Sequence, residues 1–159
     1  MPMHLLLWRH AEAEDGSPDL QRKLTAHGAQ QAQQMAEWIK VHAPRPLRIL
    51  VSPALRAQQT AAALGQPFTT EPRLAPDASV EDLLDALNDY TDQRTSPNSA
   101  TLIVGHQPTL GQTAAFWLAG APANWTIKKG AVWWLSSRTR HGETQTLIQA
   151  VISCALLTD

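Results

Sequence analysis

The chain has 159 residues, a formal net charge of −1 and only 17% charged residues. This length is typical of one domain that buries a substantial core, so we expect a single domain over residues 1–159. Without a stripe of Lys and Arg, the composition argues against general binding to nucleic acid or to an anionic membrane. The single cysteine, Cys154, excludes an intrachain disulfide and a cysteine-rich metal site.

The N-terminal apolar run does not have the form of a targeting segment. No Lys or Arg precedes it, and it stops at Arg9, unlike a secretory signal. No apolar run in the chain approaches the roughly 20 residues of a membrane-spanning helix. We therefore expect a cytoplasmic protein.

Strands and helices are predicted to alternate along the chain. An uncharged, mostly apolar run over residues 4–8 is typical of a central strand in a parallel sheet, buried on both faces. Further strands are expected at 47–52, 68–71 (a short edge strand), 100–105, 131–135 and 146–152. Helices are expected at 26–42 after a Thr25 cap, at about 54–64, from 80 after a Ser79 cap, and at 109–118. Polar loops are expected at 91–99 and 120–130, and a hairpin connection at 136–145. This order predicts a three-layer αβα fold with a mostly parallel sheet, which the last hairpin makes mixed.

Arginine and histidine side chains follow three of the strong strands at the point where each strand ends. The first strand leads into Arg9 and His10, the second is followed within one helical turn by Arg56, and the third by His106. Because the carboxyl ends of parallel strands meet at one edge of a sheet, these side chains are expected to converge. Arginine forks together with a helix N-terminus suit a phosphoryl group, and a histidine can act as a nucleophile.

Three motifs in this order resemble those of the histidine phosphatase superfamily, which includes phosphoglycerate mutases. The motifs are Leu-Trp-Arg-His-Ala at 7–11, the segment Val-Ser-Pro-Ala-Leu-Arg-Ala-Gln-Gln-Thr at 51–60, and Val-Gly-His at 104–106. The short length, Arg-Lys-Leu-Thr at 22–25 and Arg-His-Ala-Glu-Ala at 9–13 are most similar to its SixA-like phosphohistidine phosphatases. The resemblance implies a phosphoglycerate mutase-like fold, here without a large lid insertion.

The resemblance also implies roles for individual residues. His10 would be the phosphorylated nucleophile, Arg9 and Arg56 would bind the phosphate, and His106 would be the second histidine of the pocket. In the SixA-like proteins a further arginine, which matches Arg22, would also bind substrate. Alanine stands at position 11 where the superfamily has glycine, a change that matters only if the backbone there needs a positive φ or close contact. A literal Arg-His-Gly at 140–142 lies in a polar hairpin and is rejected as a second motif.

The arginines are expected to hold His10 neutral and to stabilise the oxygens of the transferring phosphoryl group. Because they supply the positive charge, no metal and no cofactor are expected. The proton donor to the leaving group stays open: Asp77, Glu12, Asp15 and Asp19 are candidates, or there is none, since a strong acid is less necessary if the leaving group is a histidine imidazole.

Short connections between the motifs predict a shallow, open pocket. Such a pocket admits phosphohistidine on a signalling protein of the histidine phosphotransfer type, which is the favoured substrate. Two alternatives remain: a phosphatase for small phosphoesters, and a non-catalytic phosphate-binding adaptor. Trp125, in the 120–130 loop, is the candidate for contact with substrate at the rim.

Overall fold

A single six-stranded sheet runs through the molecule in the strand order β3-β2-β4-β1-β5-β6. This computed structural model describes residues 3–91 and 100–157, so the polar loop expected at 91–99 lies outside the described residues from position 92 onward. The first four strands run parallel, whereas β5 is antiparallel to β1 and β6 is antiparallel to β5. The strands are β1 Met3–Arg9, β2 Leu47–Val51, β3 Thr69–Thr70, β4 Ala100–Gly105, β5 Val132–Arg140 and β6 Glu143–Ile152.

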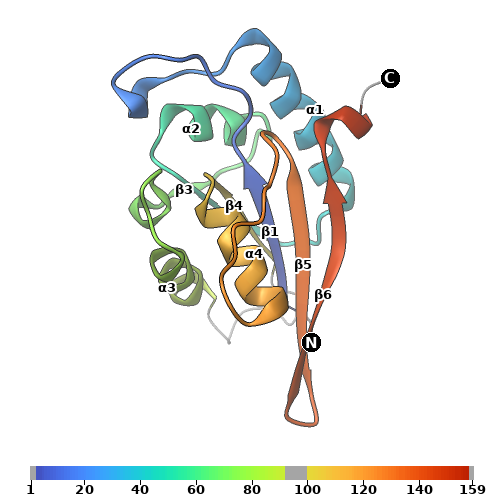
Figure 1. Cartoon of the computed structure of the whole chain (residues 1–159). Helices are drawn as coiled ribbons and strands as arrows, with labels where there is room; N and C mark the ends of the chain where they lie inside the picture. Colours follow the sequence, from blue (N-terminus) through green and yellow to red (C-terminus); the bar gives the residue numbers. More distant parts are fainter. Residues whose placement is uncertain (1–2, 92–99, 158–159) are drawn as a thin grey trace.

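Helices cover both faces of the sheet, as Figure 1 shows. They are α1 Ala26–His42, α2 Leu55–Ala62, α3 Val80–Tyr90 and α4 Thr109–Ala119, with short 3-10 helices η1 Asp19–Gln21, η2 Pro72–Leu74 and η3 Cys154–Leu157. Successive side chains of a strand point to opposite faces. In β1, Leu6 and Trp8 pack with residues of α1 and α2, whereas Leu5 and Leu7 pack with residues of α3 and α4. The expected three-layer αβα fold with a mixed sheet is therefore confirmed.

Local signals for the helix starts are confirmed at two caps. The Thr25 side chain accepts a hydrogen bond from the Gly28 amide at the start of α1. At the start of α3, Ser79 and Asp82 form a reciprocal capping box. Such caps satisfy amides that have no partner within the helix. They allow the start of a helix to be predicted without knowledge of its tertiary contacts.

β5 and β6 form the expected hairpin, but both strands are longer than expected and continue into the predicted connection at 136–145. Only His141 and Gly142 form the turn, with φ values of 51° and 78°, as in the tight turns that match strand twist. Beyond Ser137, β5 pairs with β6 and no longer with β1, and Figure 1 shows this end of the hairpin projecting past the sheet. Polar side chains are tolerated there, so the apolar pattern underestimates the strand lengths. The Arg-His-Gly at 140–142 lies in this hairpin, as expected, with Arg140 at the end of β5 and the other two residues in the turn.

The edge strand expected at 68–71 is shorter in the structure, where only Thr69 and Thr70 pair with β2. Cys154 is buried with a free thiol, and burial raises the pKa of this thiol. None of the helices within residues 3–91 and 100–157 has the length and apolar character that a bilayer span requires.

Candidate active site

The ends of three neighbouring parallel strands bring the site together. Strand β4 lies between β1 and β2 in the sheet. Immediately past the strand ends, the His10 amide donates to the Gly105 carbonyl at 3.1 Å and the Ser52 amide donates to the Val104 carbonyl at 3.0 Å. His106 follows Gly105 directly. The backbone hydrogen bonds between neighbouring strands thus continue just past the strand ends. They place His10, Ser52 and His106 side by side at one edge of the sheet.

His10 is buried and presents one ring nitrogen with a free lone pair. Its Nδ1 lies 2.7 Å from the carbonyl oxygen of Ala11. A carbonyl oxygen only accepts hydrogen bonds, so Nδ1 carries the proton and Nε2 carries the lone pair. Burial, followed by the charges of Arg56, Arg9 and Arg22, lowers the pKa of His10 to about 4, against the opposing effect of its bond to Ala11. The imidazole is therefore neutral and nucleophilic at physiological pH.

Arg9 and Arg56 are each anchored through one terminal nitrogen to a backbone carbonyl. Nη1 of Arg9 donates to the Ile127 carbonyl at 2.9 Å, and Nη1 of Arg56 donates to the Asp19 carbonyl at 2.8 Å. The Nε atom of both arginines is buried and has no hydrogen-bond partner among the described residues. Buried N–H groups without a partner are costly. Each guanidinium is thus held by a backbone carbonyl and keeps one buried donor without a partner among the described residues.

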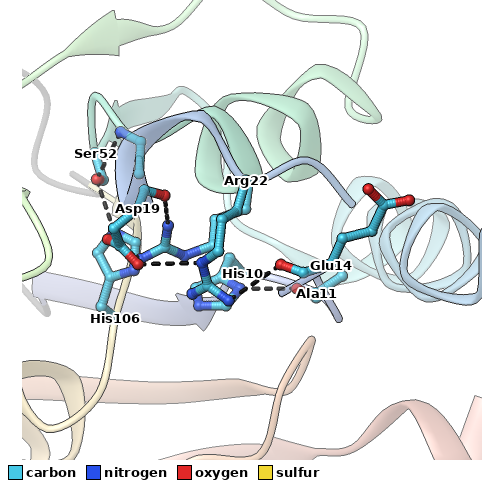
Figure 2. Close-up of polar contacts among 9 residues, drawn as sticks. His10, Ala11, Glu14, Asp19, Arg22, Ser52 and His106 are labelled. Atoms are coloured by element: carbon cyan, nitrogen blue, oxygen red, sulfur yellow. Dashed lines mark hydrogen bonds and ion pairs between the residues drawn. The ribbon is translucent and has the colours of Figure 1, made fainter. Parts of the chain in front are cut away.

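Arg22 and Asp19 form the outer part of the arginine cluster (Figure 2). Nη1 of Arg22 donates to the Glu14 carbonyl, and its Nε donates to the Asp19 carboxylate at 3.1 Å. The same carboxylate accepts from Nη2 of Arg56 at 3.1 Å. Asp19 therefore bridges two of the three expected phosphate-binding arginines, a contact that the sequence motifs did not indicate.

His106 lies against His10, with 5.1 Å between the ring centroids and 52° between the ring planes. Its Nε2 is 2.7 Å from the Ser52 hydroxyl, and its buried Nδ1 has no hydrogen-bond partner in the described part of the chain. Burial, then the proximity of His10 and Arg56, lowers the pKa of His106 to about 3. The second histidine is therefore also neutral.

Two features outside the strand ends hold this arrangement. The Thr60 hydroxyl accepts from the Ala11 amide at 3.1 Å and donates to the Arg56 carbonyl at 2.7 Å, so α2 is tied to the segment that follows His10. The Gly130 amide donates to the carbonyls of both Arg9 and His10. Ala11 has no positive φ, so its replacement of glycine introduces no backbone strain.

The four candidate proton donors lie in different surroundings. Asp19 is at the site. Burial raises the pKa of its carboxyl, but hydrogen bonds and charges from Arg56 and Arg22 outweigh burial and hold this pKa below its ordinary value. The Glu12 carboxylate accepts a hydrogen bond from the Thr25 hydroxyl at 2.7 Å. Asp15 and Asp77 are exposed. Asp77 precedes Ala78, whose carbonyl is bound by the hydroxyl of Thr109 at the start of α4.

The 120–130 loop contributes backbone to the site. Trp125 is half-buried, packs against Trp133 with 6.1 Å between ring centroids, and accepts a hydrogen bond from Gln107 through its carbonyl. Its role as a rim residue stays a prediction. Within residues 3–91 and 100–157, no group of three or more His, Cys, Asp or Glu side chains is arranged to hold a metal ion.

Comparison with known proteins points to one family. Residues 5–79 match the model of the histidine phosphatase superfamily, branch 1. The chain is 32% identical over 127 residues to a phosphohistidine phosphatase SixA homolog of Haemophilus influenzae, covering 71% of this chain and 76% of the relative. It is also 32% identical over 120 residues to phosphohistidine phosphatase SixA of Escherichia coli, covering 71% and 73%.

Solved structures share the fold over nearly the whole chain. A structure of the protein histidine phosphatase SixA complexed with tungstate has a TM-score of 0.80 and 26% identity, with 98% of this chain and 100% of the other covered. The structure of a putative phosphohistidine phosphatase SixA from Nakamurella multipartitia has a TM-score of 0.76 and 23% identity, with 96% of each chain covered. The phosphoglycerate mutase-like fold expected from the motifs is thus confirmed.

Proposed function

The chain belongs to the histidine phosphatase superfamily, and on that premise we propose that it is a phosphatase that works through a phosphohistidine on His10. The observation that carries the proposal is the 2.7 Å contact between Nδ1 of this ring and the Ala11 carbonyl oxygen. The Ala11 carbonyl holds the proton on Nδ1, so the lone pair on Nε2 is available for attack. Burial, and then the charges of three nearby guanidiniums, lowers the pKa of the imidazole and keeps it neutral.

The reaction has two steps on the same atom. In the first, Nε2 of His10 forms a bond to phosphorus as the bond to the leaving atom breaks, and that atom keeps the electron pair. In the second, a water oxygen forms a bond to phosphorus and the N–P bond breaks, with its electron pair returning to Nε2 of His10. Inorganic phosphate leaves as dihydrogen phosphate, which keeps both protons of the water. The spare Nε donors of Arg9 and Arg56 bind the phosphoryl oxygens, so positive charge is supplied without a metal ion.

The favoured substrate is phosphohistidine on a cytoplasmic signalling protein of the histidine phosphotransfer type. Asp19, the carboxyl group bound to the arginine cluster, is ionised and cannot donate a proton. An imidazole leaving group needs no such donor, because its other nitrogen can be protonated before the P–N bond breaks. The SixA relatives support this assignment through their phosphohistidine phosphatase names, and the SixA complex with tungstate supports an oxyanion site.

One activity panel tests this proposal. The purified full chain is assayed for phosphate release from a phosphohistidine-bearing phosphotransfer protein, a set of sugar phosphates and an aryl phosphate, with the exposed-histidine variant His27→Ala as control. We expect the phosphohistidine protein to give the highest kcat/KM. Higher kcat/KM for a sugar phosphate would replace this substrate class by small phosphoesters. Release from none of the three, with phosphate still bound, would identify a non-catalytic adaptor.

A further inference from the structure

The hydroxyl of Ser52 contacts His106, the second histidine of the site, at the edge of the sheet where the parallel strands end. Ser52 is fully buried at the end of β2, and its Oγ lies 2.7 Å from Nε2 of His106. Figure 2 shows the two side chains joined by this contact, with His106 beside the arginine cluster. The partners are 54 positions apart in the chain, so the contact exists only because β2 and β4 are neighbours.

The direction of this hydrogen bond follows from the other contacts of Ser52. Its Oγ accepts from the Ala54 amide at 3.2 Å, so one lone pair of the hydroxyl is used by the turn into α2. The hydroxyl proton needs an acceptor, and Nε2 of His106 is the acceptor within reach. If Nε2 carried the proton instead, both the hydroxyl proton and Nδ1 of His106 would be buried without partners. The assignment that satisfies most groups is donation from Ser52 to Nε2.

We propose that Ser52 is a positioning residue that fixes the tautomer of His106 and thereby directs its Nδ1–H toward the phosphoryl group. The catalytic role of this hydrogen bond rests on the proposed function, whereas the assignment of the ring proton to Nδ1 does not. A neutral imidazole carries one N–H, so occupation of Nε2 by the hydroxyl proton places the ring proton on Nδ1. That atom is buried and has no partner among the residues that the structure describes.

The two histidines then present complementary groups from adjacent strand ends. His10 offers a lone pair on Nε2, and His106 offers a proton on Nδ1. A fixed N–H donor that contacts a phosphoryl oxygen stabilises the negative charge that develops on this oxygen during transfer. A neutral His106 does so without the desolvation cost of a buried imidazolium. With the other tautomer, His106 would turn a lone pair toward the phosphoryl oxygens and repel them.

The tautomer is measured directly by ¹⁵N NMR of the histidine rings in the folded full chain near pH 7. We expect His106 to show a protonated Nδ1 and an unprotonated Nε2 in the wild type. In Ser52→Ala we expect the Nε2–H form to become populated, and in Ser52→Thr, which keeps the hydroxyl, the wild-type signature to return. A wild-type His106 protonated at Nε2 would overturn the proposal, whatever activity the protein has.

Kinetics then separate positioning from a general structural role. Ser52→Ala should lower kcat/KM for the preferred substrate about tenfold, as expected for one misdirected hydrogen bond to a charged group. Ser136→Ala, which removes another buried serine hydroxyl in β5, should leave kcat/KM unchanged. In a His106→Ala background, Ser52→Ala should cause no further loss, because Ser52 acts through that ring. A second tenfold loss in this background would show that Ser52 acts on the fold and would overturn the proposal.

Discussion

His10 and His106 face each other across two adjacent strand ends, with 5.1 Å between their ring centroids, and both are neutral because burial outweighs every stabilising contact of the charged form. The first ring presents a lone pair, since the Ala11 carbonyl holds its proton. The arginines around the pair add positive charge without protonating either ring. The first prediction tests whether the lone pair of His10 is the nucleophile.

Replacement of His10 by alanine should abolish turnover and leave the fold intact, because the ring lies at the end of a strand and outside both apolar clusters. Rapid quenching of the wild type with labelled substrate should trap phosphate on His10, and peptide mapping of the quenched protein locates it. The control is His27→Ala, an exposed position on α1. Turnover of His10→Ala at the wild-type rate would rule out this nucleophile.

Arg56→Lys keeps the charge but loses the planar fork, so the contact with the phosphoryl oxygens should be lost. A charge-assisted hydrogen bond contributes about 1.5–3 kcal/mol, which predicts a fall in kcat/KM of roughly 10- to 150-fold. Steady-state kinetics on the purified variant measure it. Arg73→Lys serves as control, because Arg73 pairs with Glu71 and Asp89 outside the pocket. A change below about twofold in Arg56→Lys would remove Arg56 from the site.

Asp19→Asn should bind inorganic phosphate more tightly than the wild type. The Asp19 carboxylate occupies donors of Arg22 and Arg56, and with its side chain 56% exposed it holds them only weakly. Exposed ion pairs contribute at most about 1 kcal/mol, so we expect affinity to rise roughly two- to fivefold by titration calorimetry. Glu14→Gln removes one charge from the same loop and keeps the carbonyl that Arg22 uses. Equal or weaker binding by Asp19→Asn would mean that the carboxylate supports the arginines rather than competing for them.

The free energy of unfolding should fall as the pH falls below about 6.5. The folded-state pKa values of His10 and His106 are lowered to about 4 and about 3, so the unfolded chain binds protons first. The loss should begin below the unfolded value and be complete below about pH 3, at a cost of about 3 kcal/mol for His10 and about 5 kcal/mol for His106. Urea unfolding between pH 7 and 3.5 measures this, and His10→Gln should show a smaller loss. An NMR titration midpoint of His10 near 6.5 would contradict the prediction.

Phosphatase activity should survive exhaustive EDTA treatment, since the arginines supply the charge that a metal ion supplies in other phosphatases. The measurement compares initial rates before and after chelation and dialysis, with a metal-dependent phosphatase treated in parallel as control. Activity that is lost on chelation and restored by one divalent ion would point to a metal-dependent mechanism instead.

The strand and helix pattern could be predicted because it depends on local signals. The apolar run that ends at Arg9, the Thr25 cap and the Ser79 cap are each readable within a few residues, and they correspond to β1, α1 and α3 in the structure. The convergence of Arg9, His10, Arg56 and His106 was also predictable. Parallel strands that share a sheet bring their carboxyl ends to one edge whatever the details of packing.

The hydrogen bonds that organise the site could not be predicted in this way. Arg9 is anchored by a carbonyl 118 positions away, Arg56 by a carboxylate 37 positions away, and His106 by a hydroxyl 54 positions away. Hydrophobic periodicity and capping residues determine which segments form strands and helices, because those signals act over one or two turns of chain. Which buried donor meets which acceptor was decided only by tertiary packing, since it depends on the position to within about 1 Å of segments that are distant in sequence.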